Sequence, residues 1–313
     1  MNSVLSKVNG KGLPKLIYIM GTGRSGTTIL EVLLSNNDGI SGVGEVDHIF
    51  KDGYINDVDC SCGQTVSNCS LWKGVREDCG WNDVDVKALD RLFKSFSSHV
   101  RFPLVALGLI SEKKINKYMR VNEGLFMAVS FRANAQVIVD SSKYAGRGLA
   151  LYRCFPSNTK VVCITRSPSG LISAFQRTDT EEQRPKSVLG TFLYYTYTMT
   201  CFRIVGFLLR NDILFVRYED LSEYPIETMQ VIQDWANLDL SVAMEIVRQN
   251  KSLSIHHIVT GNRLRRKGKV RFATKQNRSY RFNNPFVNIV SMLMLCYRNM
   301  LFFRVMGVED DRK

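Results

Sequence analysis

The sequence lacks any run of 18 or more apolar residues without a charge, which argues against a membrane-spanning helix. The nearest candidate, residues 285–308, contains Arg298 and Arg304, so we expect a core or surface-docked helix with at most a peripheral membrane contact. Residues 1–15 are polar and lack the apolar centre of a signal peptide. We therefore expect a cytoplasmic protein with reduced cysteines.

Recognisable nucleic-acid-binding motifs are also missing. We find no zinc finger, RRM signature or basic zipper, so we expect no specific nucleic-acid partner. The net charge of +13 nevertheless favours an anionic ligand, and much of the excess lies in residues 263–281. A protein that only binds polyanions through this segment is one alternative to an enzyme.

Four short apolar runs alternate with helical patterns along the chain. This alternation predicts an α/β protein, with a P-loop-like three-layer α/β/α fold and a mostly parallel central sheet. We expect one domain over residues 1–313, with a helical insertion at 83–135 and a basic segment followed by a C-terminal helix at 256–313. The expected strands are residues 16–20, 137–139, 159–165 and 213–216.

Residues 15–37 combine a strand, a glycine-rich turn and the start of a helix. This arrangement directs backbone N–H groups and the positive end of a helix dipole at one point, which suits a phosphate. The spacing resembles G-x-x-x-x-G-K-[ST], but Thr27 replaces the lysine that reaches the β- and γ-phosphates. The turn therefore favours a nucleotide without a γ-phosphate. The expected phosphate-binding residues are Gly21, Thr22, Gly23, Arg24, Ser25, Gly26, Thr27 and Thr28.

Polar residues also follow the other expected strands, at 140–143, 166–173 and 217–220. Because the carboxyl ends of parallel strands meet at one edge of a sheet, these groups should lie near the glycine-rich turn. Arg166 and Ser173, one strand-to-helix turn apart, are candidates for a second phosphate. The pattern predicts a pocket for a multiply phosphorylated ligand.

These motifs resemble those of the PAPS-dependent sulfotransferase superfamily, in particular its bacterial, carbohydrate and tyrosylprotein branch. GTGRSGTT at 21–28 resembles the family's loop for the 5′-phosphosulfate. ITRSPSGLISAF at 164–175 resembles the 3′-phosphate element R-D-P-x-x-x-x-S, with Ser167 in place of the aspartate. Further similar segments, in family order, are VDSSK at 139–143, RYEDL at 217–221 and GNRLR at 261–265.

The resemblance implies transfer of a sulfuryl group from 3′-phosphoadenosine 5′-phosphosulfate (PAPS) to a hydroxyl group of a carbohydrate, lipid or small metabolite, such as a saccharide or a lipid-linked glycan. The product would be PAP, and no metal is required if arginine and lysine supply the charge. Arg166, Ser173 and Arg265 would contribute to the donor site. The competing hypothesis is a P-loop-type phosphotransferase or NTPase without the usual lysine, which would bind Mg-ATP and use Asp140 for the metal.

Candidates for the chemistry of this reaction can be named individually. Arg24 and Lys143 are suited to neutralise the leaving phosphate and the sulfuryl oxygens. Related enzymes place a catalytic glutamate in a Gly-Glu context shortly after the first helix, which points to Glu45 as the base. His48 is the competing base, although a lone histidine near a loop is more often structural.

A cysteine-rich stretch at residues 59–72 contains Cys60, Cys62 and Cys69, and Cys79 follows. Four thiolates can bind zinc, but these spacings are not among the strong zinc-ribbon patterns. We favour reduced, buried thiols in a turn-rich insert and keep zinc and a disulfide as alternatives.

Overall fold

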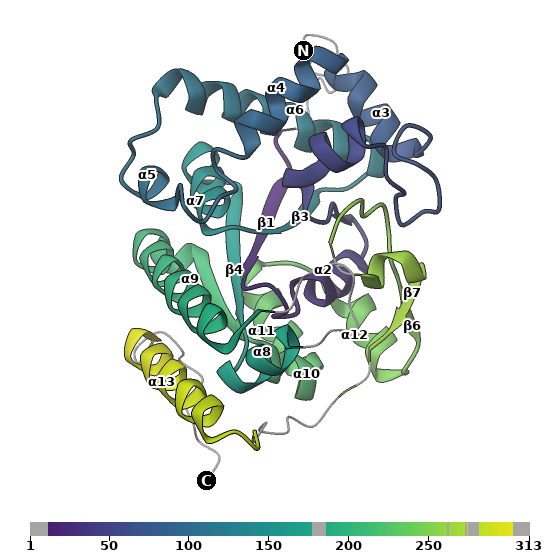
Figure 1. Cartoon of the computed structure of the whole chain (residues 1–313). Helices are drawn as coiled ribbons and strands as arrows, with labels where there is room; N and C mark the ends of the chain where they lie inside the picture. The colour runs from purple at the N-terminus through teal and green to yellow at the C-terminus, as the bar shows by residue number, and fades with distance from the viewer. Residues whose placement is uncertain (1–11, 177–185, 262, 273, 275–281, 303–313) are drawn as a thin grey trace.

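A five-stranded, parallel sheet forms the centre of the molecule (Figure 1), in the strand order β2-β3-β1-β4-β5. The computed structural model describes residues 12–176, 186–261, 263–272, 274 and 282–302. Helices cover both faces of the sheet, so the predicted three-layer α/β/α fold with a parallel sheet is confirmed. The strands are β1 (Lys15–Gly21), β2 (Ile40–Gly42), β3 (Val137–Lys143), β4 (Thr159–Thr165) and β5 (Ile213–Arg217).

The central strand β1 supplies side chains to a separate core on each face of the sheet. Leu16, Tyr18 and Met20 pack into the first core, whereas Ile17 and Ile19 pack into the second. The alternation follows from the two-residue period of a strand. Because both faces are covered by helices, β1 appears in the sequence as a continuous apolar run.

The helices divide between the two faces. The first core contains side chains from α3 (Ser70–Cys79), α4 (Asp83–Phe93), α5 (Phe102–Ala106), α6 (Glu112–Ala133), α7 (Ala145–Cys154), α8 (Pro168–Phe175), α9 (Val188–Leu209) and α13 (Pro285–Phe302). The second core contains side chains from α2 (Thr27–Ser35), α10 (Tyr218–Glu223), α11 (Pro225–Ala236) and α12 (Ser241–Arg248). The expected insertion at 83–135 corresponds to α4, α5 and α6.

Several short elements have no strong sequence signal. After β2 come a 3-10 helix, η1 (Val46–His48), and a π-helix, η2 (Ile49–Ile55). A 3-10 helix, η3 (Arg210–Asp212), precedes β5, and another, η4 (Arg263–Lys267), lies in the basic segment. The basic segment also contains a two-stranded antiparallel sheet of β6 (Ser252–Ser254) and β7 (Lys269–Arg271). Three-residue strands are too short to show a two-residue period, so the sequence could not indicate them.

A buried ion pair between α7 and β3 is also hydrogen-bonded to the helical insertion. Arg147 of α7 is fully buried and donates from Nε to Asp140 Oδ2 over 2.9 Å. Its two Nη atoms donate to Tyr118 and Asn122 of α6 over 2.7 and 3.1 Å. Asp140 Oδ1 accepts from the backbone N–H of Ser142 over 2.9 Å. Both carboxylate oxygens of Asp140 are therefore occupied by protein donors.

Candidate active site

The glycine-rich turn between β1 and α2 has the close-packed backbone of a phosphate loop. A Cβ atom at Gly21 would lie 2.7 Å from the carbonyl oxygen of Ile164, which is too close. Gly26, the N-cap of α2, has a φ angle of 91°, and a Cβ there would clash with the ring of Tyr218. Ser25 Oγ closes the turn by donating to the Thr22 carbonyl oxygen over 2.7 Å. Glycine is thus required at both ends of the turn.

The same turn offers donors that an anion could use. Thr22 Oγ1 is buried and has no hydrogen-bond partner among the described residues. The backbone N–H of Gly23 donates to the hydroxyl oxygen of Tyr194 over 3.0 Å, and this hydroxyl can itself donate. Thr27 and Thr28 are buried in the first turn of α2, where backbone N–H groups have no helical acceptor. The expected residues 21–28 therefore form one cradle at the carboxyl end of β1.

The second expected phosphate-binding residue, Arg166, lies against this cradle. Its Nη1 donates to the Arg24 carbonyl oxygen over 2.8 Å, and its guanidinium lies 4.5 Å from the ring centroid of Tyr218. A Cβ at Gly170 would lie 3.0 Å from Arg166 Nε, so the small residue there leaves room for the arginine. The contacts hold the guanidinium between the end of β4 and the start of α10.

The serine that replaces the family aspartate keeps a structural role. Ser167 is the N-cap of α8, and its Oγ accepts from the Gly170 N–H over 3.3 Å. Its own N–H donates to Glu219 Oε1 over 2.8 Å. Serine and aspartate are both preferred at this helix position, so either residue can cap α8. Ser173 lies half-buried further along the same helix.

Arg265 can be placed only in part. Its backbone belongs to η4, and its side chain lies outside the described part of the structure.

Two expected catalytic residues are brought together by the fold. Lys143 Nζ forms an ion pair with Glu45 Oε1, joining the end of β3 to the turn after β2. Both side chains are mostly buried, with 23% and 14% of their surface exposed. The backbone of Lys143 has a φ angle of 73°, in the left-handed region that residues other than glycine rarely adopt. The Glu45 carbonyl oxygen accepts from Thr260 Oγ1 over 2.9 Å, so the basic segment also supports this residue.

Glu31 positions the turn that carries Glu45, a role that the sequence analysis missed. It lies fully buried in α2, where its Oε1 accepts from the Gly44 N–H over 2.5 Å and its Oε2 accepts from Ser141 Oγ over 2.6 Å. Burial raises the pKa of Glu31 to about 8 despite these two hydrogen bonds. A glutamate in an amphipathic helix looks solvent-exposed in the sequence, so only the contacts reveal it.

His48, the competing base, has its ring nitrogens near two other carboxylates. Nε2 lies 3.7 Å from Asp47 Oδ2, and Nδ1 lies 3.6 Å from Asp52 Oδ2. Asp47 is buried, which raises the pKa of its carboxyl group. Both ring nitrogens of His48 thus lie near carboxylates of its own segment, an arrangement that suits a structural role.

A group of aromatic side chains lies beside the glycine-rich turn at residues 21–28 and was also missed. His99 packs against Tyr144 and Tyr194, with ring centroids 4.9 and 5.5 Å away. Lys186 Nζ lies 3.7 Å from the ring centroid of Tyr194. Burial and the nearby Lys186 lower the pKa of His99 to about 4, so its imidazole is neutral at pH 7. These residues are far apart in the sequence and carry no common spacing signal.

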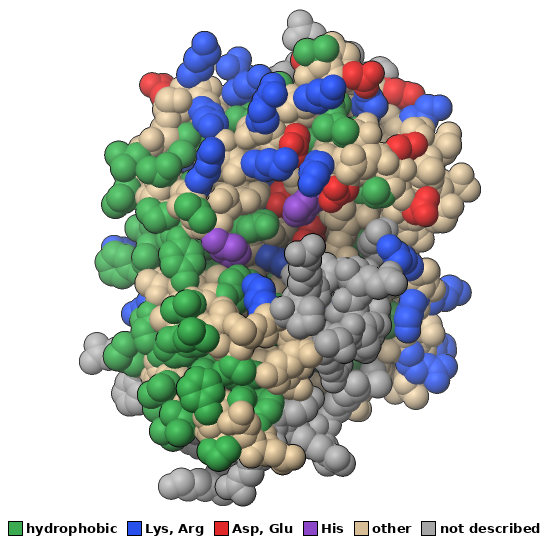
Figure 2. All heavy atoms as spheres, viewed as in Figure 1, with side chains coloured by type: hydrophobic (Ala, Val, Ile, Leu, Met, Phe, Trp, Pro, Cys, Tyr) green, Lys and Arg blue, Asp and Glu red, His purple; other side chains and the backbone are tan. Residues whose placement is uncertain are grey.

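An apolar face begins next to this aromatic group. Figure 2 shows hydrophobic side chains along one side of the molecule, over α5, α9 and α13. Tyr197 connects the two regions, because it is partly exposed and its hydroxyl donates to the His99 carbonyl oxygen over 2.6 Å. On α9, the exposed apolar side chains are Leu189, Leu193, Tyr197, Ile204, Phe207 and Leu208.

Among the described residues, one helical segment, Val188–Asp212, is long and apolar enough to cross a membrane, judged by length and composition. The core helices of soluble proteins meet the same criterion. This segment has 39% of its most apolar window buried, and α9 packs against α13.

A model of the family described as "Sulfotransferase family" matches residues 14–241. No curated protein matches the sequence. Among solved structures, a sulfotransferase domain from the curacin biosynthetic pathway is 16% identical, with a TM-score of 0.48, covering 91% of this chain and 99% of its own. The STF1 sulfotransferase from Mycobacterium tuberculosis is 16% identical, with a TM-score of 0.46, covering 85% and 81%. A mouse sulfotransferase, SULT7A1, crystallised with PAP, is 11% identical, with a TM-score of 0.42, covering 99% and 91%.

Proposed function

The chain belongs to the sulfotransferase family, and on this basis we propose that it transfers a sulfuryl group from PAPS to an acceptor hydroxyl, releasing PAP. The observation that carries the proposal is the family match over residues 14–241. This match includes the phosphate loop, the Glu45–Lys143 ion pair and Arg166.

The donor site in this proposal uses the residues at the carboxyl ends of β1 and β4. Residues 21–28 would hold the 5′-phosphosulfate, because this turn offers backbone N–H groups, the start of a helix and the Thr22 hydroxyl, which has no partner within the described part of the chain. Arg166, Ser173 and Arg265 would hold the 3′-phosphate. Arginine suits this role because its planar guanidinium can bind two phosphate oxygens at once. PAPS, when bound, supplies the sulfuryl group.

The protein residues would then act by positioning and by charge. We assign Glu45 the role of accepting the proton from the acceptor hydroxyl as that oxygen bonds to sulfur. Lys143 lies next to Glu45 and, with Arg24, would stabilise the negative charge that develops on the sulfuryl and bridging oxygens. The Glu45–Lys143 ion pair brings the base and a stabilising cation to one location before any substrate binds.

The acceptor in this proposal is a carbohydrate, a lipid or a small metabolite. The apolar face favours an acceptor that combines a hydroxylated head with an apolar part, such as a lipid-linked glycan, since Tyr197 joins this face to the aromatic group beside the phosphate loop. A sugar should therefore be sulfated with a lower KM when it carries an alkyl chain than when it does not. Equal KM values for the two sugars would contradict the proposal that the acceptor has an apolar part.

The competing NTPase hypothesis needs an acidic ligand for magnesium, and Asp140 was its candidate. Both oxygens of Asp140 accept from protein donors, and Arg147 already neutralises its charge. Thermal unfolding with PAP, with ATP and with Mg-ATP separates the two functions. We expect PAP to raise the midpoint most, without magnesium, and transfer from PAPS to be detectable by mass spectrometry of the acceptor. A larger stabilisation by Mg-ATP would refute the proposal.

A further inference from the structure

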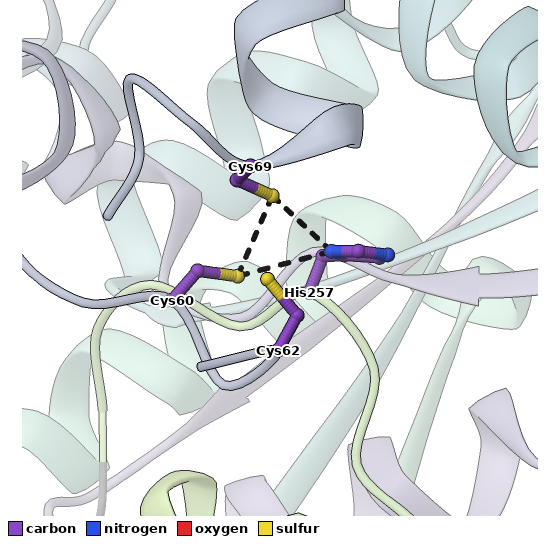
Figure 3. A group of neighbouring side chains, drawn as sticks. All are labelled: Cys60, Cys62, Cys69 and His257. Carbon is purple, nitrogen blue, oxygen red and sulfur yellow. Dashed lines mark hydrogen bonds between the residues drawn. The ribbon is translucent and has the colours of Figure 1, made fainter. Parts of the chain in front are cut away.

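Three cysteines and one histidine from distant parts of the chain converge beside the candidate active site. Cys60, Cys62 and Cys69 lie in the turn-rich segment before α3, and His257 lies in the segment after β6. The four candidate ligand atoms all lie within 4.8 Å of one another. Figure 3 shows the three sulfur atoms and the imidazole directed towards one another. Cys79, the fourth cysteine expected from the sequence, lies outside this group at the end of α3.

The distances within the group match a tetrahedral metal site. Cys60 Sγ lies 3.7 Å from Cys69 Sγ, and His257 Nδ1 lies 3.2 Å from Cys69 Sγ and 3.9 Å from Cys60 Sγ. A tetrahedral zinc ion with Zn–S bonds of about 2.3 Å and Zn–N bonds of about 2.0 Å separates two sulfurs by about 3.8 Å, and a sulfur from a nitrogen by about 3.5 Å. Cys60, Cys69 and His257 are thus spaced for one ion, and Cys62 Sγ lies within 4.8 Å of their ligand atoms.

We propose that Cys60, Cys62, Cys69 and His257 bind one zinc ion as a structural site. Four protein ligands fill the coordination sphere of zinc and leave no position for a substrate, which is the pattern of a structural and not a catalytic site. The metal would be held by three thiolates and a neutral imidazole. Two of the four ligands are buried, which limits competition by solvent.

Backbone contacts place Cys60 and Cys62 in one tight turn. The Gly63 N–H donates to the Cys60 carbonyl oxygen over 2.9 Å, and Gly63 has a φ angle of 83° that favours glycine. A β-bridge between Asp59 and Thr65 closes the base of the turn. Cys69 follows as the N-cap of α3, where the positive end of the helix dipole stabilises a thiolate.

Other contacts bring His257 to this turn independently of any metal. The Ser61 N–H donates to the Ile258 carbonyl oxygen over 2.9 Å, and the Ile258 N–H donates to Ser61 Oγ over 2.8 Å. Trp72 Nε1 donates to the His257 carbonyl oxygen over 2.7 Å. Because these bonds fix the backbone directly after the His257 side chain, they hold this residue at the turn before an ion arrives.

The proposed zinc site lies next to the segment that contacts Gly44 and Glu45 in the candidate active site. Three residues after His257, Thr260 donates to the carbonyl oxygen of Glu45. A Cβ at Gly44 would lie 2.7 Å from Ile258, so the segment also packs closely on the turn before Glu45. A metal at His257 would therefore anchor the segment that supports the proposed base.

Metal analysis of the purified full-length protein tests the site without reference to activity. We expect one zinc ion per chain in the wild type and in Cys296→Ser, in which the altered cysteine is exposed and lies on α13. Cys62→Ser alters an exposed ligand and should lower the zinc content at least several-fold. Cys79→Ser should retain zinc, since Cys79 lies outside the group.

Cobalt substitution and amide hydrogen exchange test the site in the wild-type protein. These two measurements therefore do not require any variant to fold. Wild-type protein reconstituted with Co²⁺ should show the intense visible bands of tetrahedral cobalt with thiolate ligands. Removal of the metal should reduce amide protection in residues 257–261. The proposal is overturned if the folded, reduced wild type binds neither metal, if it holds iron in place of zinc, or if Cys60 and Cys69 form a disulfide. It is also overturned if Cys62→Ser binds zinc as tightly as Cys296→Ser does.

Discussion

Lys143 and Glu45 form an ion pair although they are 98 positions apart in the sequence. The pair spans the end of β3 and the turn after β2, which are neighbours only because these strands are adjacent in the sheet. On the amino side of Glu45, Glu31 binds the Gly44 N–H. On the other side, Thr260 binds the Glu45 carbonyl oxygen. The proposed base is therefore held by three separate parts of the chain.

Glu45→Gln should lower turnover by about 10²- to 10⁴-fold, the usual contribution of a positioned base, while leaving the affinity for PAP nearly unchanged. Glutamine keeps the size of the side chain and removes its basicity. Steady-state turnover and PAP calorimetry measure the two quantities. His48→Asn is the matched comparison and should lower turnover much less, because the ring of His48 faces Asp47 and Asp52. Near-normal turnover of Glu45→Gln together with an inactive His48→Asn would transfer the role to His48.

Arg166→Ala should weaken binding of PAP by roughly 10- to 150-fold, because one charge-assisted hydrogen bond contributes about 1.5–3 kcal/mol. Adenosine 5′-phosphosulfate, which has no 3′-phosphate, should lose far less affinity. Calorimetry with both ligands measures the difference. Arg248→Ala is the control, since Arg248 is exposed on α12 and pairs only loosely with Glu245. Equal losses of both ligands in Arg166→Ala would show that Arg166 does not bind the 3′-phosphate.

Glu31→Gln should change how the free energy of unfolding depends on pH. Burial raises the pKa of Glu31 from 4.5 to about 8 in the folded state, so folded protein holds a proton that unfolded protein has released. The contribution of Glu31 to the free energy of unfolding therefore falls between pH 4.5 and about 8, at up to roughly 1.4 kcal/mol per pH unit. Glutamine cannot ionise, and it can still accept from Gly44 and donate to Ser141.

Urea unfolding of Glu31→Gln and wild type across pH 5–9 measures this effect. The stability of the variant relative to the wild type should rise steadily with pH and level off above about pH 8. A constant difference between the two proteins at all pH values would mean that Glu31 ionises at its ordinary pKa in the folded protein.

Arg147→Met should destabilise the fold by about 3–5 kcal/mol, because it leaves the buried carboxylate of Asp140 without its partner. The double variant Arg147→Met/Asp140→Asn should recover part of this loss, since no charge is then buried. Urea unfolding at neutral pH measures both. Arg248→Met removes an exposed pair and should cost less than about 1 kcal/mol. If Arg147→Met also lowered the free energy of unfolding by less than about 1 kcal/mol, the buried ion pair would not be what holds the helical insertion in place.

The sequence by itself determined the layers of the fold and the strand, glycine-rich turn and helix around residues 21–28. β1 and β4 are almost fully buried and β5 is half-buried, so these strands appear in the sequence as apolar runs followed by polar residues. Local spacing also sufficed for residues 21–28, because a strand, a glycine turn and a helix start are formed by neighbouring residues. The hydrogen bond from Arg166 to the Arg24 carbonyl oxygen confirms that the residues after β1 and β4 lie together.

Only the tertiary structure decided which distant side chains meet. Glu31 looks like an exposed helix residue until its contacts with Gly44 and Ser141 are seen. His257 replaces Cys79 as the fourth member of the cysteine group, because hydrogen bonds between Ser61 and Ile258 bring two distant segments together. Spacing along the chain encodes helices, strands and tight turns, whereas pairings across some 200 positions depend on how those elements pack.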